Sequence, residues 1–329
     1  MIHRSALVLA VAILLAASAS AQLAFQPGDV IVSGYSVAAN PATLDARMAI
    51  YDAHGQFQRF LLPRTPLGIG EPEFDGFGRL FVPISGRLAI VSPAGAVQSE
   101  VYGHGCCIEF FALDKVATAF GLFGGGGAGI NEVHPDGTLR YFDVADLHVM
   151  GDDLASDQCT LFVSGYKDVN QHSVGHIAAV NVCDPARPVT RMFQLPVPYP
   201  GPVRVLPDGD LLVGSHPGLS GPDDRLVKVS PTGTVHALFP IRATAIAVDP
   251  SGTSAWIVTP AGISKIALDS GATLLGPIPS PFDYAIEGIA VRGEARAAIP
   301  PLNVPALDPR GVAILALALI AVALLVRPR

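Results

Sequence analysis

A short turn phrase recurs along this chain and constrains its fold more than any other feature. Each copy follows a few β-forming residues, combines Pro, Asp or Ser with Gly, and is followed by more β-formers. The six copies are Asp52–Gly55, Ser92–Gly95, His134–Gly137, Asp184–Arg187, Ser230–Gly233 and Asp269–Gly271. Their last residues are 38 to 50 residues apart, so the sequence predicts one repeated β unit of that length.

A period of roughly 40 to 50 residues is typical of the blades of a β-propeller. We therefore expect an all-β fold, a six-bladed β-propeller over residues 22–297. Asp29–Ser33 is predicted to be a second strand with no first strand ahead of it, and Ile286–Val291 a first strand with nothing after it. The two ends should complete one blade and close the ring, which removes open sheet edges. A seven-bladed ring or a two-sheet sandwich is the alternative.

The first 21 residues have the organisation of a secretory signal peptide. His3 and Arg4 precede the apolar run Ala6–Ala17, and Ala19–Ala21 is a small-residue cleavage site. We expect residues 1–21 to be removed and the protein to be exported. The alternative is an uncleaved anchor, although the run is closer to the ~7–15 residues of a signal core than to the ~20 of a membrane span.

The C-terminal end has the pattern of a membrane anchor. Gly311–Val326 contains no charged or polar side chain and is followed by Arg327–Arg329. We expect a transmembrane helix at 311–326, a basic cytoplasmic end at 327–329 and a linker at 298–310. The body between the two ends would then be extracytoplasmic. A C-terminal helix buried in the fold is the alternative.

The residues ahead of the apolar run resemble a sorting signal. Ile299–Leu302 and Val304–Leu307 precede Asp308–Gly311. This arrangement is similar to the IPTL-type, PEP-CTERM-like C-terminal signals of Gram-negative bacteria. It departs from them at Ala306 or Pro301, where the motif has Thr, and at Arg310, where it has an aromatic residue. The resemblance implies an exosortase-type processing protease as a partner. It also implies anchoring in the inner membrane facing the periplasm, or sorting to the cell surface.

The four cysteines fall into two pairs. Cys159 starts one predicted strand and Cys183 ends the next, so in a hairpin centred near Gln171 they face each other. An exported protein favours a disulfide between them. Cys106 and Cys107 are adjacent, and they either form a vicinal disulfide or remain free.

Residues 22–297 resemble NHL-type and gluconolactonase-like six-bladed propellers, in phrases such as Ile246–Gly252. The first strand of each blade should line a central channel, and aligning these strands places polar residues at the mouth formed by the N-terminal ends of the strands: Glu71 or Glu73, Glu109, Asp152 or Asp153, Arg204, Thr244 and Glu287. Acidic oxygens are the ligands that Ca²⁺ prefers.

Glu71, Glu109, Asp152 and Glu287 are thus candidate Ca²⁺ ligands, and Arg204 and Thr244 candidate ligand-binding residues. The resemblance implies that a metal held in this way would polarise a lactone or ester carbonyl. In the alternative, the acids are solvated or pair with Arg204.

The net charge and the lack of a complete catalytic set limit the functions that the sequence allows. The net charge is −7 and the body has no basic cluster, which disfavours nucleic-acid binding. No complete catalytic set is present, so the sequence favours a binding or scaffold module with a protein or carbohydrate ligand at the cell surface. The alternatives are a Ca²⁺-dependent lactonase or esterase and, from the adjacent cysteines, a quinone-linked dehydrogenase.

Overall fold

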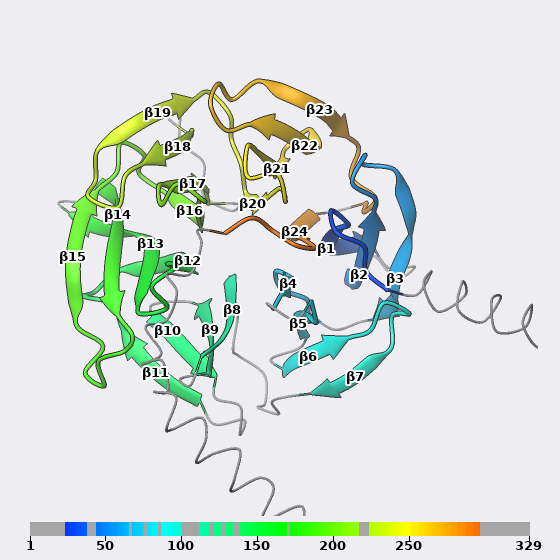
Figure 1. Ribbon diagram of the computed structural model, residues 1–329, viewed down its shortest axis with the longest axis horizontal. Helices are drawn as coiled ribbons and strands as arrows, with labels where there is room; N and C mark the ends of the chain where they lie inside the picture. The colour runs from blue at the N-terminus through cyan, green and yellow to red at the C-terminus, as the bar shows by residue number, and fades with distance from the viewer. Residues whose placement is uncertain are drawn as a thin grey trace, which may run out of the picture. The chain divides into compact units, whose positions relative to one another are not determined.

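The described part of the chain is built from strands alone. The computed structural model describes residues 24–37, 44–65, 68–75, 78–84, 87–100, 112–118, 121–126, 129–133, 139–169, 172–216, 224–283 and 285–296. Within these ranges there are 24 strands in six four-stranded antiparallel sheets, and no helix. The sheets lie side by side around a common centre (Figure 1).

Each sheet runs from one strand near the centre of the ring to a fourth strand at its rim. In that order, the sheets are β24 (Ala285–Val291), β1 (Val30–Val37), β2 (Leu44–Tyr51) and β3 (Phe57–Thr65); β4 (Glu73–Phe74), β5 (Leu80–Ile84), β6 (Arg87–Val91) and β7 (Val97–Glu100); β8 (Ala112–Thr118), β9 (Gly121–Gly126), β10 (Gly129–Val133) and β11 (Leu139–Asp143); β12 (His148–Leu154), β13 (Thr160–Val169), β14 (His172–Asn181) and β15 (Val189–Gln194); β16 (Pro200–Val205), β17 (Leu211–Ser215), β18 (Leu226–Val229) and β19 (Val235–Phe239); β20 (Ala245–Val248), β21 (Ser254–Thr259), β22 (Gly262–Ala267) and β23 (Thr273–Ile278).

The two ends of the body close the ring as the sequence predicted. Strand β24 pairs antiparallel with β1, with Val30 opposite Val291 and Ile31 opposite Ala290. One sheet therefore contains the first and the last described strands, and the edge that each would expose alone is covered.

The sheet β4–β7 departs from the equal blades that the repeat suggested. Its innermost strand has two residues, whereas the other five innermost strands have four to seven. Pro72, next to β4, has no N–H to donate to a ladder. The residues before it bond elsewhere: Ser33 Oγ donates to Gly70 O at 2.8 Å, and the Tyr35 hydroxyl accepts from Ile69 N at 2.9 Å.

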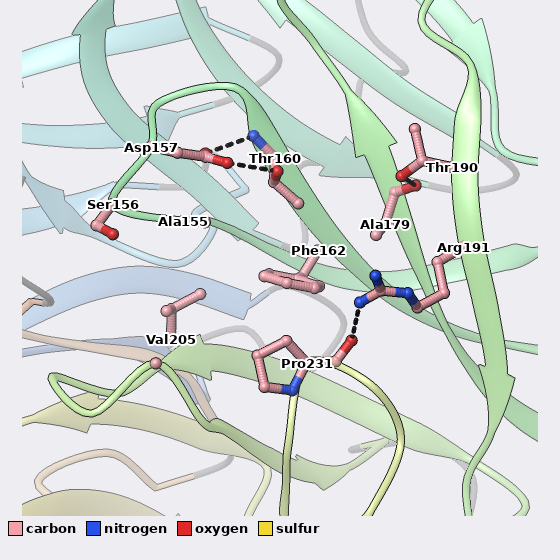
Figure 2. A pocket seen from close by; sticks show the side chains of 11 residues that line it. Ala155, Ser156, Asp157, Thr160, Phe162, Ala179, Thr190, Arg191, Val205 and Pro231 are labelled. Carbon is pink, nitrogen blue, oxygen red and sulfur yellow. Dashed lines mark hydrogen bonds between the residues drawn. The ribbon is translucent and has the colours of Figure 1, made fainter. Parts of the chain in front are cut away.

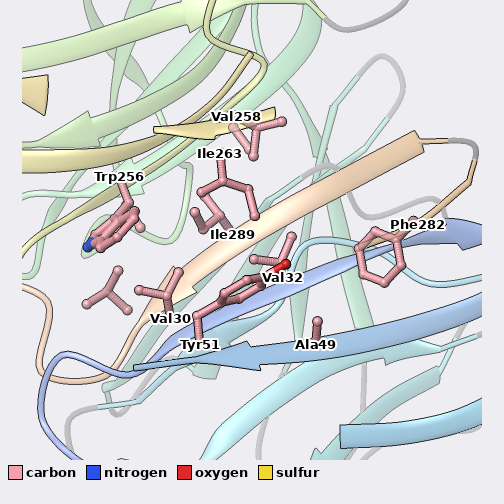
Figure 3. Close-up of a cluster of buried hydrophobic side chains, with 12 residues drawn as sticks. Val30, Val32, Ala49, Tyr51, Trp256, Val258, Ile263, Phe282 and Ile289 are labelled. Carbon is pink, nitrogen blue, oxygen red and sulfur yellow. The ribbon is translucent and has the colours of Figure 1, made fainter. Parts of the chain in front are cut away.

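Apolar side chains fill the spaces between neighbouring sheets. The described residues form five buried hydrophobic clusters, each combining side chains of two adjacent sheets. In Figure 3, Trp256 and Ile263 of the β20–β23 sheet face Val30, Tyr51 and Ile289 of the β24–β3 sheet. Alternating strand residues thus pack sheet against sheet, which is the packing that a ring of blades needs.

The recurring turn phrase also joins neighbouring sheets. In three places an arginine near the rim of one sheet donates to the carbonyl of the proline in the next sheet's turn. The pairs are Arg59 with Pro93, Arg140 with Pro185 at 2.6 Å, and Arg191 with Pro231 at 2.8 Å. A charged donor makes such a bond stronger than a neutral one, so each phrase holds its own hairpin and the sheet beside it.

The predicted disulfide is present. Cys159 and Cys183 are bonded across the β13–β14 hairpin, with their Cα atoms 5.0 Å apart. The hairpin register places Thr160 opposite Asn181, and Cys159 O accepts from Val182 N at 2.8 Å. Cys106 and Cys107 lie outside the described residues.

Removing this disulfide should weaken the protein measurably. In the chain-entropy model a bond that closes a loop of this size stabilises by about 3 kcal/mol, so Cys159→Ala/Cys183→Ala should lower the free energy of unfolding by about that amount. Urea unfolding of both proteins under oxidising conditions measures the difference. Adding reductant should destabilise the parent to a similar extent; equal stability of parent and variant would show that the bond contributes nothing.

Candidate functional site

Six charged side chains meet where the innermost strands converge. They come from the loop before β4, from β4, β12 and β16, and from the residues after β24. We call them the central charge cluster: Glu71, Glu73, Asp153, Arg204, Glu294 and Arg296.

Arg204 is the hub of the central charge cluster. Its side chain is 2% exposed, and its Nη2 donates to Glu71 Oε1 at 2.9 Å and to Glu73 Oε2 at 3.0 Å. Burial alone would lower the pKa of Arg204, but the surrounding carboxylates, Glu71 foremost, hold it above its usual range. The guanidinium therefore stays charged and has acidic partners on two sides.

Asp153 links two of the sheets within the cluster. Its Oδ2 accepts from the backbone N–H of Val205 at 2.5 Å, and its Oδ1 accepts from Arg296 Nη1 at 3.1 Å. Gly151, two residues earlier, allows this approach, because a Cβ there would lie 2.8 Å from Gly201 O. Strands β12 and β16 can therefore come close enough to share the carboxylate.

The closing segment, Arg292–Arg296, completes the cluster. It follows β24 and crosses the centre of the ring toward β16 (Figure 1). Arg292 N donates to Asp29 O at 2.8 Å, Glu294 Oε1 accepts from Val248 N at 2.5 Å, and Arg296 Nη2 donates to Glu73 Oε1 at 3.2 Å. These contacts tie the last described residues to several sheets at once.

The cluster holds more negative than positive groups. Its four carboxyls face two guanidinium groups, so it cannot be neutral if every acid is ionised. Burial raises the pKa of Glu71 to about 8, although the Arg204 guanidinium acts to lower it. The neighbouring carboxylates raise it as well, Glu73 foremost. At neutral pH, Glu71 therefore keeps its proton and relieves part of the repulsion.

This proton makes the stability of the protein depend on pH. The unfolded carboxyl has a pKa near 4.5 and the folded one a pKa of about 8, so the folded state holds a proton that the unfolded state has lost. The contribution is fully present below pH 4.5 and is lost as pH rises through 8. We expect the free energy of unfolding to fall between pH 5 and pH 9.

Glu71→Gln should flatten this dependence, because glutamine resembles the protonated acid at every pH. The variant should match the parent near pH 5 and exceed it near pH 9 in urea unfolding. Glu287→Gln, the same change at an exposed position on β24, is the control and should keep the parental slope. An unchanged slope in Glu71→Gln would assign the pH dependence to other groups.

The structure brings together only some of the predicted site residues. Glu71 and Arg204 are in contact, but Glu71 binds the guanidinium where a metal ion was expected. Asp152 is buried, and it is Asp153 that bonds into the cluster. Because β12 begins at His148 and β16 at Pro200, Asp153 and Arg204 lie near the C-terminal ends of their strands, not at the predicted end.

The other predicted site residues lie apart from the cluster or outside the description. Thr244 is partly buried, and its N–H donates to Val258 O at 2.9 Å. Glu287 is exposed at a bulge in the β24–β1 ladder. Glu109 lies outside the described residues. Within the described ranges, no group of three or more His, Cys, Asp or Glu residues is arranged to hold a metal ion.

Sequence reasoning missed Glu294 and Arg296. They follow the last predicted strand, in a stretch that carried no turn phrase and no strand pattern. The signal was a Glu and an Arg two residues apart at the end of a charge-poor body. Only the fold shows that they return to the ring centre.

A second candidate site is a pocket between the β12–β15 and β16–β19 sheets. Its volume is about 320 Å³. Its lining residues are Ala155, Ser156, Asp157, Thr160, Phe162, Ala179, Thr190, Arg191, Val205, Gly209 and Pro231. Figure 2 shows the Phe162 ring between Val205 and Arg191, while Asp157 accepts from Thr160 N and Oγ1. Apolar and polar side chains both line the pocket, as in many small-ligand sites.

Comparisons with known proteins identify the fold. No family model and no curated protein matches the chain in sequence. Among solved structures it is similar to TolB from Acinetobacter baumannii, with 13% identity and a TM-score of 0.58 over 80% of this chain and 66% of that one. It is also similar to the β-propeller domain of Cps50 (Swd1) from Myceliophteria thermophila, with 11% identity and a TM-score of 0.52 over 82% and 91%.

The chain is therefore an all-β propeller. A streptogramin B lyase structure matches with 13% identity and a TM-score of 0.46, which carries no argument about activity. Identities this low establish the architecture alone, and function has to be argued from the sites. The predicted signal peptide, linker and C-terminal anchor lie outside the described residues; within the described ranges no helix could cross a membrane.

Proposed function

We propose that this protein is an exported β-propeller that binds a protein or carbohydrate ligand at the cell envelope and does not catalyse a reaction. The signal-like residues 1–21 and the apolar tail 311–326 support export and anchoring. The tail's likeness to IPTL-type signals supports processing by an exosortase-type protease. It also supports a place in the inner membrane facing the periplasm, or on the cell surface, of a Gram-negative bacterium.

The binding role is supported by the central charge cluster, whose acidic side chains are already hydrogen-bonded within the protein. Glu71 and Glu73 are bonded to the buried Arg204, and Asp153 to the backbone of Val205 and to Arg296. Glu73 and Asp153 are thus compensated by the protein's own cations, and Glu71 keeps its proton at neutral pH. The sequence resemblance to gluconolactonase-like propellers implies a hydrolase that would use such acids to hold a cation, but here the acids contact Arg204 and Arg296.

Cell fractionation tests export and anchoring. The full chain, with an epitope inserted between the exposed Asp269 and Ser270, should enter the membrane fraction of a Gram-negative host and be digested by protease added to spheroplasts. A chain ending at residue 297 should appear in the soluble periplasm. Full-length protein found in the cytosol would overturn the proposal.

Metal analysis tests the absence of hydrolase chemistry. The purified full chain should melt at the same temperature before and after chelator, and Ca²⁺ should not raise its stability. One tightly held Ca²⁺ per chain, lost together with stability, would overturn the binding role and favour the hypothesis of a Ca²⁺-dependent lactonase or esterase.

A further inference from the structure

The closing segment occupies the ring centre as a short bound peptide would. Its last three residues, Glu294–Arg296, present an acidic, a small and a basic side chain in turn. Each of the three meets a separate feature of the ring.

The first feature recognises a carboxylate. Glu294 Oε1 accepts from the backbone N–H of Val248 at 2.5 Å and lies 3.7 Å from Arg204 Nε. The Glu294 side chain is 4% exposed. A backbone donor together with a buried guanidinium is the combination that proteins use to bind carboxylates.

The second feature recognises a guanidinium. Arg296 Nη1 donates to Asp153 Oδ1 at 3.1 Å, and its Nη2 donates to Glu73 Oε1 at 3.2 Å. Two carboxylates on separate strands thus hold the two ends of one planar donor fork. The Arg296 side chain is 30% exposed, so this end of the segment opens toward solvent.

The middle position packs on apolar side chains. Ala295 packs on the buried cluster that contains Leu206 and Val248. A polar residue between the acid and the base would lose this apolar contact.

The segment is joined to the ring through a turn. Arg292 exchanges two backbone hydrogen bonds with the N-terminal residues, donating to Asp29 O and accepting from Gly28 N, each at 2.8 Å. Gly293 then adopts a left-handed backbone with φ of +77°, a conformation that glycine takes without strain. Backbone hydrogen bonds thus hold the chain in place up to Arg292, and Glu294–Arg296 follow directly after the glycine.

We propose that the ring centre is a peptide-binding site for an acidic–small–basic sequence, filled in the isolated chain by its own Glu294–Arg296. A partner protein that carries the same three-residue pattern displaces the segment and takes its place. The inference rests on the proposed binding role and names the chemistry of one ligand.

Competition from the attached segment sets the binding behaviour. A tethered segment acts at an effective concentration in the millimolar range, so a free peptide at micromolar concentration cannot compete with it. The unmodified chain should therefore bind such a peptide poorly. Removing the two charged side chains from the segment should uncover the site while leaving its walls intact.

The test uses the full chain and a synthetic peptide with the sequence of residues 293–297, labelled with a fluorophore. Fluorescence polarisation should show at least tenfold tighter binding to Glu294→Ala/Arg296→Ala than to the parent. A peptide with Gln in place of both Glu and Arg should not bind. Added unlabelled peptide should raise the melting temperature of the double variant and not that of the parent.

Several results of this binding experiment would overturn the inference. A double variant that melts cooperatively but does not bind the peptide overturns the inference, and so does equal binding by parent and variant. If the double variant does not fold, Arg296→Gln keeps the Glu294 anchor and should bind the peptide between the two extremes; parental affinity in that variant would also overturn the inference. None of these results changes the cell-fractionation outcome, which tests the proposed function separately.

Discussion

Replacing Arg204 with methionine should remove about 3 to 5 kcal/mol from the free energy of unfolding at neutral pH. Methionine keeps much of the volume of the side chain but none of its charge. The change leaves the Glu73 and Glu294 carboxylates without their common cation, and an uncompensated buried charge is costly by about that amount. Urea unfolding at pH 7 measures the loss.

Two further measurements separate charge from packing. Adding Glu73→Gln to Arg204→Met should restore part of the lost stability, because one buried charge fewer is then left without its cation. Arg225→Met, which removes an exposed arginine beside the same sheet, should change stability by no more than about 0.5 kcal/mol. A loss of less than about 1 kcal/mol in Arg204→Met would mean that the cluster is not held together by its cation.

Breaking the buried pair between Glu132 and Arg187 should cost a similar amount. Arg187 donates through Nε to Glu132 Oε2 at 3.0 Å and through Nη2 to Glu132 Oε1 at 2.9 Å. Both side chains are at most 5% exposed. The pair joins β10 to the turn after β14, so Glu132→Met and Arg187→Met should each lose about 3 to 5 kcal/mol.

The double variant distinguishes a true pair from two independent losses. Glu132→Met/Arg187→Met should be more stable than the sum of the single losses predicts, because no charge is left buried alone. The control is Asp208 with Lys228, 2.8 Å apart, where the Asp208 side chain is 55% exposed. Its coupling energy should be about 0.2 to 1 kcal/mol. Equal coupling in both pairs would contradict the role of burial.

Arg187 also shows why one turn phrase lacks its glycine. Gly55, Gly95 and Gly233 end their phrases with a positive φ, and Arg187 has the same backbone with φ of +52°. A non-glycine residue is strained in this conformation. Here the contact with Glu132 offsets that strain. Because Glu132 is 55 residues away, no local sequence pattern predicts this contact.

Much of the ring could be predicted because its signals are local. A turn with Gly at a left-handed position and alternating apolar residues on either side need only neighbouring residues, so the hairpins and the Cys159–Cys183 bond followed from spacing. The out-of-phase ends predicted the β24–β1 pairing for the same reason. The short β4 was missed, because the bonds that Ser33 and Tyr35 of β1 make to the residues before it act across the fold.

The sequence by itself determined the strand pattern, the all-β propeller and the disulfide, since each depends on residues close together along the chain. The tertiary structure alone decided which acids meet which cations. Glu71 and Arg204 are 133 residues apart, and Glu73 and Arg296 are 223 apart. Such pairs form because a closed ring brings its innermost strands and its last residues to one centre, where a low-dielectric interior leaves each charge no partner but another side chain or a backbone dipole.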